Sequence, residues 1–590
     1  MRTSTVVAVA AVLIAAGWPQ ASVRAADGEG AKATGRVEGE VTPSSTAPMP
    51  GDPVAPQVAP AAPAVPASAA APSAPAVTTG GPVSPVTPQA PQAPSSPFAA
   101  DLEKALEGIG AKVRASAAGD DQRAASGILT DDFDALSAFY AQRAHAPLWV
   151  DGNGLTPRGR ALMAAMQAAA EYGLDPSALD VPEARDGLAP ADLAALDANL
   201  TVAAINYARH ARGARIPEPA EMLNSNLDRK PQLHDTKRVL ERLEAATEAD
   251  IAATMAALHP VHPQFERLRQ AFLKASGDGK GGGRLSKEAK RLRANMEFWR
   301  WMWDDLGDLY VFNNIPEFMQ YVVHNGEIVR SDRIVVGEIG KQSSVFSRPL
   351  RSVVLRPRWR VPESIMVHEL WPSLLRGGGL MRKYGLEITT KSGESRDWRA
   401  IDWSKDDIRN YHVWQPPGRR SVLGFVKFVF PSQHTIFMHD TPDKWMFNSR
   451  QRTHSHGCLR VRNPIELTEI VLKHDKGWDA DKVKDLVDRG PLDNEVEMEK
   501  HIPIHLAYFT AWVDDDGKVR FFRDIYGHEK RVTLALDGAW RKIDKGRNHL
   551  APAKPSFDPD RIARSGTEER RQSQGRNALE IMSEALGWSF

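Results

Sequence analysis

A long run of proline and small residues divides this 590-residue chain and limits where folded domains can lie. From about Glu38 to Pro97 the sequence is built almost entirely from Pro, Ala, Ser, Thr, Val and Gln, as in APQVAPAAPAVPASAAAPSAPAV. Such a segment has too little apolar surface to offset the entropy lost on ordering. We therefore predict a disordered, extended linker at residues 26–98, with the folded domains after it.

The extreme N-terminus has the layout of a secretory signal. Arg2 supplies a short positive region, VVAVAAVLIAAGW supplies an apolar core, and ASVRAAD supplies small residues around Ala25 and Ala26. The apolar run is shorter than the about 20 residues that a membrane span needs. We therefore expect a signal peptide at residues 1–25 that is cleaved, with export and no stable membrane insertion afterwards. An uncleaved membrane anchor is the alternative.

The rest of the chain is too long for one core, because cores stop growing at roughly 250–300 residues. Helical periodicity extends over residues 99–307, where we predict a helical domain. The helix that follows GDGKGGGR carries a stripe of large apolar residues, namely Leu292, Met296, Trp299 and Trp303. We interpret this stripe as core packing.

The periodicity changes to that of strands at DLYVFNNIPEFMQYVVHNGEIVRSDRIVVGEIG. Short β-rich runs alternate with turn sequences there, which is typical of hairpins in an antiparallel sheet. We predict a mainly antiparallel-β domain at residues 308–538, interrupted by an insertion at about 363–410. Residues 539–590 are polar, and we predict a mostly flexible C-terminal tail. The fold class is thus α+β and multidomain.

Cys458 is the only cysteine of the chain, so it forms no disulfide within it. Its polar neighbours, such as Ser455 and Arg460, fit poorly with a cysteine buried as a small hydrophobic residue. A thiol becomes a nucleophile when an imidazole accepts its proton or stabilises its anion. His439, at the end of a predicted strand, is our candidate for that imidazole, and His456 is our candidate for shaping the loop.

Gly457 directly precedes the cysteine and allows the backbone to bend sharply. Such a bend would aim the amide of Cys458 at a developing oxyanion. Together these residues predict acyl transfer through a thioester, without a cofactor. Zinc ligation by His439, His454, His456 and Cys458 is the competing interpretation. The H-S-H-G-C spacing does not match common zinc-finger spacings, and no second cysteine exists, so we predict no metal site.

The stretch FMHDTPDKWMFNSRQRTHSHGCLRVRN resembles the signature of the L,D-transpeptidases of bacterial cell walls, in which a histidine precedes a Ser/Thr-His-Gly-Cys motif. Further stretches are similar, among them DLGDLYVFNNIPEF, VVGEIGKQS, LRPRWRVPESI, WQPPGRRSVLGFVKFVFPSQHTIFMHDTP and IPIHLAYFTAWVDDDGKVRFFRDIYG. The resemblance covers roughly residues 131–527. It is to the large periplasmic members, which join a helical scaffold domain to the catalytic domain, and it implies that the insertion is a capping subdomain.

The resemblance also implies residue roles. Cys458 would be the nucleophile and His439 its base, and the amides of Gly457 and Cys458, with His456 nearby, would form the oxyanion site. For the substrate, Ser455 would support the loop and Arg460 would hold the stem peptide, with a carboxylate as its natural partner. Asn463 is a weaker substrate-binding candidate.

By the same resemblance, the thiolate would attack the bond before the terminal D-alanine of a tetrapeptide stem. The acyl group would then pass to a diaminopimelate amine, which cross-links peptidoglycan and contributes to cell-wall organisation and cell shape. Carbapenems would acylate the same thiol. We expect stem peptides and other cell-wall enzymes as partners, and no nucleic acid, since the formal net charge is only +1.

Three alternatives stay open. Transfer to water would make the protein an L,D-carboxypeptidase, and transfer to a free D-amino acid would make it an exchange enzyme. A non-catalytic wall-binding scaffold is the third, although pure binding needs no nucleophile.

Overall fold

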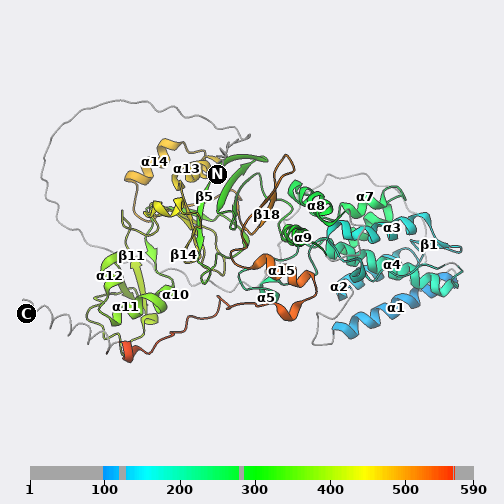
Figure 1. The fold of residues 1–590 in the computed structure, drawn as a ribbon, viewed down its shortest axis with the longest axis horizontal. Coiled ribbons are helices and arrows are strands. Elements are labelled where there is room, and N and C mark those ends of the chain that lie inside the picture. Colours follow the sequence, from blue (N-terminus) through cyan, green and yellow to red (C-terminus); the bar gives the residue numbers. More distant parts are fainter. Residues whose placement is uncertain (1–96, 118–127, 186, 278–284, 563, 565–590) are drawn as a thin grey trace, which may run out of the picture. The chain divides into compact units, whose positions relative to one another are not determined.

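The computed structural model describes residues 97–117, 128–185, 187–277, 285–562 and 564, which all belong to one compact unit of the chain (Figure 1). The predicted signal peptide and nearly all of the predicted linker lie outside the described residues. In the part that is described, no helix is both long enough and apolar enough to span a membrane.

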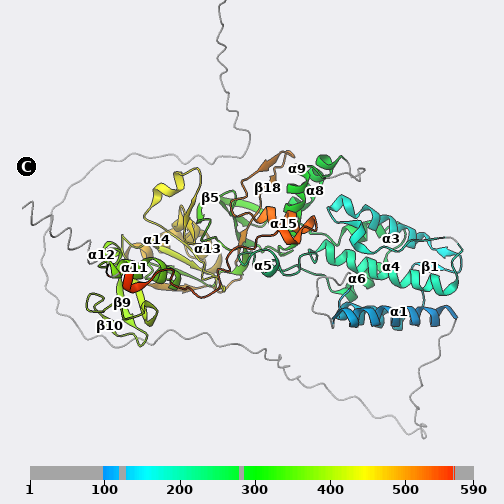
Figure 2. The same cartoon turned by 60° about the horizontal axis from the view of Figure 1, so that its bottom comes forward.

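The first part of the described chain is helical, apart from one short hairpin, β1 (Val150–Asp151) and β2 (Gly154–Leu155) (Figures 1 and 2). Its helices are α1 (Pro97–Ala117), α2 (Thr130–Gln142), α3 (Pro157–Gln167), α4 (Pro190–Ala211), α5 (Pro219–Met222), α6 (Thr236–Ala245), α7 (Ile251–Ala256), α8 (Pro263–Ser276) and α9 (Lys287–Arg300). Several begin at side chains that accept a backbone N–H: Thr156 before α3, Asp235 before α6 and Ser286 before α9.

A buried carboxylate holds the helical part together. Asp197, on α4, accepts a hydrogen bond from the hydroxyl of Tyr140 at 2.6 Å. Its other oxygen accepts the backbone N–H groups of Leu148, Trp149 and Val150. These four donors stabilise a carboxylate that would otherwise be costly to bury, and they fix the segment between α2 and β1 on α4.

Helices α8 and α9 belong to a different core from that of α1–α4, α6 and α7. Leu292, Met296 and Trp299 of the predicted stripe are buried on α9, whereas Trp303 lies after the end of the helix and is partly buried, and all four pack with the apolar residues of the β-sheet. Trp299 stacks on Phe509 at 4.6 Å between ring centroids, and Asn295 accepts hydrogen bonds from the backbone N–H groups of Thr510 and Ala511. The core therefore crosses the boundary that we predicted at residue 307.

The second part is built on an eleven-stranded, mainly antiparallel sheet, so the protein is α+β. The strand order is β16-β7-β12-β13-β15-β5-β4-β3-β17-β6, with β14 added on β5. Only β13·β15, β14·β5 and β17·β3 are parallel pairs among the described strands of this sheet. The strands are β3 (Leu309–Asn314), β4 (Met319–His324), β5 (Glu327–Gly337), β6 (Phe346–Pro349), β7 (Ser352–Leu355), β12 (Val426–Val429), β13 (Met438–His439), β14 (Thr453–Ser455), β15 (Leu459–Val461), β16 (Asn494–Glu497) and β17 (Pro503–Ala507).

Helices and a hairpin flank this sheet. They are α13 (Pro464–Lys476), α14 (Ala480–Arg489), α15 (His528–Leu536), β18 (Ala511–Val513) and β19 (Val519–Phe521). The loop between α5 and α6 also joins it, because Leu227 forms a parallel bridge with Val345. In the same loop Arg229 donates to the hydroxyl of Ser347 and to the carbonyl of Leu506. The helical part thus contributes backbone and side chains to the edge of the sheet.

Residues 359–415, here called the cap, form a separate small subdomain with its own apolar core. It consists of β8 (Trp359–Arg360), α10 (Glu363–Ile365), the π-helical turn Met366–Leu370, α11 (Trp371–Leu375), α12 (Gly379–Tyr384), β9 (Glu387–Thr390), β10 (Ser395–Arg396) and β11 (Tyr411–Gln415). The four strands pair in the order β10-β9-β11-β8. The cap lies between β7 and β12 in sequence, at the place of the predicted insertion.

The C-terminal segment differs from the flexible tail that we predicted from residue 539. Up to Ile562 it makes specific contacts, and Ala553, Phe557 and Ile562 pack on the core of the cap. Phe557 meets the indole ring of Trp371 edge to face at 5.5 Å. The polar composition of the segment hides these few apolar side chains, each of which gains stability by burial.

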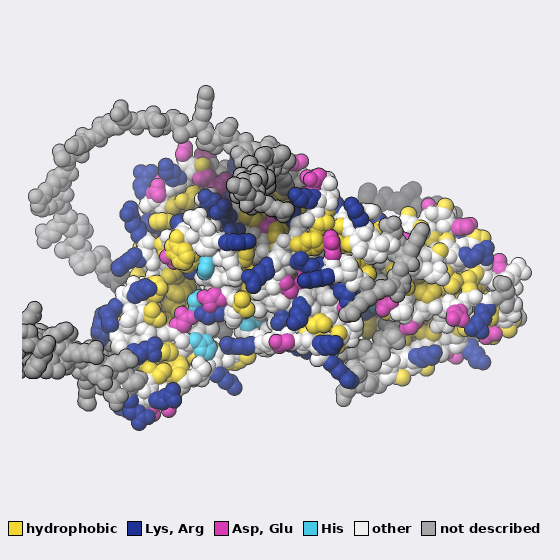
Figure 3. Space-filling model, viewed as in Figure 1, with side chains coloured by type: hydrophobic (Ala, Val, Ile, Leu, Met, Phe, Trp, Pro, Cys, Tyr) yellow, Lys and Arg dark blue, Asp and Glu magenta, His cyan; other side chains and the backbone are white. Residues whose placement is uncertain are grey.

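The charged side chains are mixed in sign. Figure 3 shows Lys and Arg side chains interspersed with Asp and Glu on the face that it views, in keeping with the formal net charge of +1. That face offers no single-sign field that would attract a polyanion.

Candidate active site

Two neighbouring parallel strands bring the predicted nucleophile and base to one face of the sheet. In the pair β13·β15, Met438 lies opposite Leu459 and His439 lies opposite Arg460. Because side chains alternate along a strand, the fully buried Met438 and Leu459 point into the core. His439, Arg460 and Cys458, which is two residues before Arg460, therefore share the opposite face.

Strand β12 adds a cation to that face. Lys427 lies opposite His439 in the antiparallel pair β12·β13, and its ammonium group is 4.6 Å from the ring centroid of Phe437. The ring of Phe437 is in turn 5.6 Å from that of His439. Burial, and next the charge of Arg460, lower the pKa of His439 to about 3. The imidazole is therefore neutral at physiological pH.

The tautomer of His439 follows from its hydrogen bond. Its Nδ1 lies 2.5 Å from the carbonyl oxygen of Asp440. A carbonyl oxygen only accepts, so Nδ1 carries the proton and Nε2 keeps the lone pair. The carboxylate of Asp440 accepts the backbone N–H groups of Thr441 and Phe425, which holds this turn in place. His439 is thereby set up as a base through Nε2.

Cys458 is partly buried, and its thiol lies 4.0 Å from the carbonyl oxygen of Thr435. Burial raises the pKa of the Cys458 thiol to about 11. Among the described residues no hydrogen bond joins the thiol to His439. These two pKa shifts favour a neutral thiol and a neutral imidazole at neutral pH over a thiolate–imidazolium pair.

Short hydrogen bonds close the turn before the cysteine. The hydroxyl of Ser455 donates to the carbonyl of Cys458 at 2.5 Å and accepts the N–H of Gly457 at 3.1 Å. Gly457 has φ +116°, which favours glycine, and its carbonyl accepts the hydroxyl of Ser343 at 2.6 Å. We expected the Gly457 amide at the oxyanion site, but this N–H is used inside the turn. In the described geometry, Gly457 therefore shapes the turn.

His456 points to the cap. Its Nε2 lies 2.6 Å from Oε1 of Glu369, which also binds the ammonium group of Lys341 at 2.8 Å. The hydrogen bond from His456 is the main cause that lowers the pKa of Glu369 to about 2. These three residues, here called the latch, connect the cysteine turn, the loop after β5 and the cap. The side chain of His456 is thus engaged with the cap through the latch.

Arg460 has a buried N–H donor, at Nε, that is not hydrogen-bonded to any described residue. Its Nη1 donates to the hydroxyl of Thr441 at 3.1 Å and lies 3.3 Å from the carboxylate of Asp443. An unpaired guanidinium N–H beside the cysteine is suited to a carboxylate or carbonyl of a ligand.

Asn463 lies elsewhere, at the N-terminus of α13. Its side-chain amide donates to Asp332 at 2.7 Å, and its carbonyl accepts from Arg330. Arg330 also pairs with Glu466 on α13. This network anchors the helix to β5, so the structure does not bring Asn463 to the cysteine.

Several residues of the site were not singled out from the sequence, namely Lys427, Phe437, Thr435, Glu369 and Lys341. Lys427 interrupts the apolar run GFVKFVF, and a charged residue within a predicted strand was the signal that could have marked it as a site residue. The others depend on contacts between segments distant in sequence. No group of three or more His, Cys, Asp or Glu within the described ranges would hold a metal ion.

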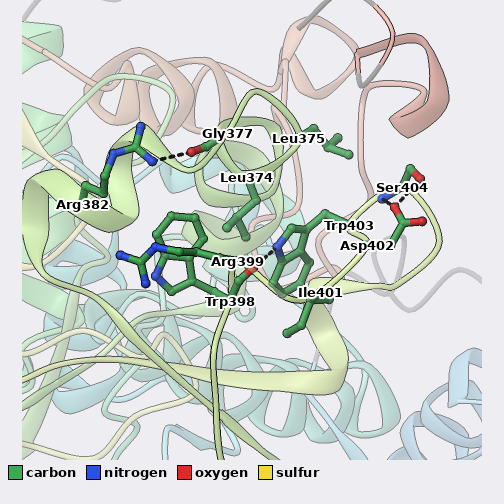
Figure 4. Close-up of a pocket in the computed structure, with 10 residues that line it drawn as sticks. All are labelled: Leu374, Leu375, Gly377, Arg382, Trp398, Arg399, Ile401, Asp402, Trp403 and Ser404. Atoms are coloured by element: carbon green, nitrogen blue, oxygen red, sulfur yellow. Dashed lines mark hydrogen bonds between the residues drawn. The ribbon is translucent and has the colours of Figure 1, made fainter. Parts of the chain in front are cut away.

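The cap contains a cavity of about 510 Å³, in which indole rings lie beside guanidinium groups (Figure 4). Trp403 donates through its indole N–H to the carbonyl of Trp398 at 2.9 Å. The guanidinium of Arg399 lies over the ring of Trp398 at 4.5 Å. None of the residues that line this cavity belongs to the cysteine site.

Comparison with protein families agrees with this architecture. Residues 308–490 match an L,D-transpeptidase catalytic domain, and residues 134–272 match a scaffold domain. Together with the fold, these matches define a protein with a helical scaffold domain before a cysteine-containing catalytic domain. Residues 308–490 therefore belong to the family of L,D-transpeptidase catalytic domains, and residues 134–272 to that of its scaffold domains.

Individual relatives are more distant. A protein of Haemophilus influenzae (strain ATCC 51907 / DSM 11121 / KW20 / Rd), described as "Putative L,D-transpeptidase", is 26% identical over 406 residues, which cover 68% of this chain and 79% of that protein. A solved structure, "Structure of the Ldtfm-avibactam carbamoyl enzyme", aligns at 10% identity with a TM-score of 0.18, over 59% of this chain and 97% of its own. That overlap is too low to support an argument.

Proposed function

We propose that this chain is a peptidoglycan L,D-transpeptidase in which Cys458 is the nucleophile and His439 the base. The observation that carries the proposal is the shared sheet face of the only cysteine and an imidazole whose Nδ1–H is fixed by the carbonyl of Asp440. That bond leaves Nε2 of His439 to take the thiol proton.

Acylation would run as follows. The Cys458 thiol passes its proton to Nε2 of His439 as the sulfur attacks the carbonyl carbon before the terminal D-alanine of a tetrapeptide stem. The C–N bond breaks, and the leaving amine of D-alanine takes that proton from His439. The product is a thioester on Cys458 and free D-alanine. Since thiol and imidazole are neutral at rest, the proton moves during attack.

Transfer to the acceptor reverses these roles. The side-chain amine of a diaminopimelate on a second stem attacks the thioester carbon and gives a proton to Nε2 of His439. The C–S bond breaks, and the departing sulfur takes this proton back. The new amide bond cross-links the two stems, and the free enzyme is restored.

Two groups would stabilise the substrate. We assign the oxyanion to the backbone N–H of Cys458, because the N–H of Gly457 is already bonded to Ser455. We assign a carboxylate or carbonyl of the stem to the unpaired Nε of Arg460. Neither role needs a cofactor.

The location and the inhibitor are part of the same proposal. A cleaved signal at residues 1–25 would place the enzyme in the periplasm, where its stem-peptide substrates and other cell-wall enzymes are found. Carbapenems would acylate the thiol of Cys458, since they present a strained carbonyl to the same nucleophile.

Product analysis by mass spectrometry tests the function. The full-length chain is incubated with purified disaccharide-tetrapeptide, beside Cys458→Ala and His439→Gln as matched controls. Cross-linked dimers that have lost one D-alanine, and that both variants fail to form, would establish transpeptidation. Tripeptide monomers alone would make the protein a carboxypeptidase, and stems with an exchanged D-amino acid would make it an exchange enzyme. No Cys458-dependent product would leave a wall-binding scaffold.

A further inference from the structure

The segment 544–562, here called the C-terminal strap, contacts the helical part, the sheet domain and the cap in turn. At its start, the carbonyl of Lys545 accepts the side-chain amide of Asn224 at 2.6 Å. His549, further along, lies 2.8 Å through Nδ1 from the hydroxyl of Ser225. The first contacts of the strap are therefore with the loop between α5 and α6.

From His549 a hydrogen-bonded relay continues into the catalytic domain. Nε2 of His549 lies 2.7 Å from Nδ1 of His434, and Nε2 of His434 lies 3.0 Å from the carboxylate of Asp228. Asp228 also pairs with Arg348 at 3.0 Å. The relay thus joins the strap to a residue of the α5–α6 loop through the segment before β13.

Chemistry fixes the direction of this relay. A carboxylate only accepts, so Nε2 of His434 donates to Asp228, and in the neutral form of the ring Nδ1 is then the acceptor. His549 therefore donates from Nε2 and accepts the hydroxyl proton of Ser225 on Nδ1. Burial lowers the pKa of His549 to about 4, so the neutral form that this pattern needs is present at neutral pH. Every member of the relay has a defined donor or acceptor role.

His434 directly precedes Thr435, the residue whose carbonyl oxygen lies 4.0 Å from the Cys458 thiol. Thr435 has φ +53°, which is unfavourable for a β-branched residue, so its neighbours must hold it in place. The His434 ring is held on one face by Phe346, at 5.2 Å between ring centroids, and at its edge by the hydrogen bond to His549. The residue before the Thr435 carbonyl, which lies near the thiol, is thus held by a contact with the strap.

We propose that His549 is a positioning residue of the cysteine site, which holds His434 and thereby the Thr435 carbonyl that encloses the Cys458 thiol. The inference rests on the proposed function for its kinetic consequence only. Its structural consequence, the enclosure of the thiol, is measured without substrate. The strap then continues to the cap, where Phe557 packs on Trp371, so one segment contacts both His434 and the cap.

Alkylation of Cys458 by iodoacetamide, followed by intact mass over a range of pH, is the first measurement, and it is unambiguous because the chain has one thiol. In the full-length chain, His549→Ala should free the Thr435 turn and expose the thiol. The midpoint of the pH profile should then fall by about one unit, so alkylation at neutral pH rises about tenfold. Turnover of disaccharide-tetrapeptide should move the other way, with kcat lower by about tenfold or more and KM nearly unchanged.

Three variants make the result specific. His549→Gln keeps an amide donor for His434 and should recover most of the wild-type pH profile. Ser225→Ala removes the donor that sets the tautomer of His549 and should give an intermediate profile. Lys554→Ala, exposed on the same strap, should leave both readouts unchanged.

Wild-type alkylation and kcat in folded His549→Ala would overturn the proposal, as would equal changes in Lys554→Ala. If His549→Ala does not fold by circular dichroism, His549→Gln and Ser225→Ala decide, and wild-type profiles in both would overturn it. If the wild-type protein shows no turnover on any stem peptide, the proposed function fails while the alkylation profiles still decide this inference.

Discussion

His439 and Arg460 are direct partners across the parallel pair β13·β15, so a guanidinium group flanks the imidazole of the proposed base. Lys427 flanks it from β12. Burial, and next the charges of Arg460 and Lys427, disfavour protonation of this imidazole, so its Nε2 carries no proton at neutral pH. Under the proposed function, the thiol would lose its proton during attack on a bound substrate.

The wild-type thiol should react slowly with small alkylating agents at neutral pH. Burial raises its pKa to about 11, so the thiolate fraction keeps growing with pH far above 8. We expect the alkylation rate to increase about tenfold per pH unit up to at least about pH 10. Iodoacetamide kinetics followed by intact mass check this, with circular dichroism to show that the chain stays folded.

A plateau of the rate below about pH 8 would contradict that expectation, since it would mean a preformed thiolate. His439→Gln serves as the control. If the resting imidazole is neutral, this variant should leave the alkylation profile nearly unchanged and abolish turnover.

Breaking the latch should expose the thiol by loosening the cap. Glu369→Gln removes the charge that holds both His456 and Lys341, so we expect Cys458 alkylation to rise severalfold. The ion pairs are partly exposed, and high salt should therefore have a similar effect on the wild-type protein. His456→Ala should have the same effect. Combining it with Glu369→Gln should add little, because both substitutions remove the same contact.

Acid should open the latch as well. The folded pKa of Glu369, about 2, lies below its ordinary 4.5, so the stabilisation is present above about pH 4.5 and is lost as the pH falls toward 2. Limited proteolysis of the cap reports this loosening. Equal proteolysis of wild type and Glu369→Gln at neutral pH would show that the latch does not hold the cap.

Gly457→Ala should impair turnover more than stability. At φ +116° an alanine is strained, and its Cβ would lie 3.3 Å from the carbonyl oxygen of Gln342. The strain costs about 1–3 kcal/mol, and release of it would shift the Cys458 amide. We expect kcat to fall at least about tenfold. Gly326→Ala is the matched control, because it has φ +82° in an open hairpin; similar activity losses in both variants would refute a specific role of the turn.

Buried histidines should make the protein acid-sensitive. His505 is fully buried between the hydroxyl of Ser347 and the carbonyl of Leu306, and burial lowers its pKa to about 3 from 6.5. As the pH falls, His505 is protonated in the unfolded state before it is protonated in the folded state. The free energy of unfolding therefore falls as the pH drops from about 6.5 toward 3. The slope is up to about 1.4 kcal/mol per pH unit for this group. Urea unfolding between about pH 5 and 8 should show a smaller slope in His505→Gln.

An unchanged pH slope in His505→Gln, with lower stability at all pH values, would assign the acid sensitivity to other groups. His259 and His528 are the next candidates, because burial lowers the pKa of each of them well below the ordinary value.

The sequence predicts the order of the helical and β parts, because the change from helical to alternating periodicity near Leu309 is a local signal. It also marks Cys458, His439 and Gly457, since a lone thiol among imidazoles and a glycine is a chemical pattern that needs no fold. The sequence does not show which atoms of these residues form hydrogen bonds. The tautomer of His439 and the partner of the Gly457 N–H depend on the three-dimensional geometry of two turns.

Contacts between segments far apart in the chain could not be predicted from the sequence. The latch joins residues 87 positions apart, and the relay joins His434 to His549 across 115. A single chain gives no signal for such pairs, because neither partner has a distinctive local pattern. For Asn463 the sequence suggested a role that the structure does not support. The residue stands beside the cysteine motif in sequence, but its side chain donates to Asp332 in the network that anchors α13.

The apolar stripe of α9 has a consequence for how this architecture is inherited. Trp299 and its neighbours fill the core of the sheet from the helical side of the boundary. A gene fragment that started at residue 308 would encode a sheet with an open hydrophobic face, and such a face favours aggregation. Recombination at that boundary would yield poorly folded products, so α9, which follows the scaffold-domain match, is expected to be inherited together with the catalytic domain.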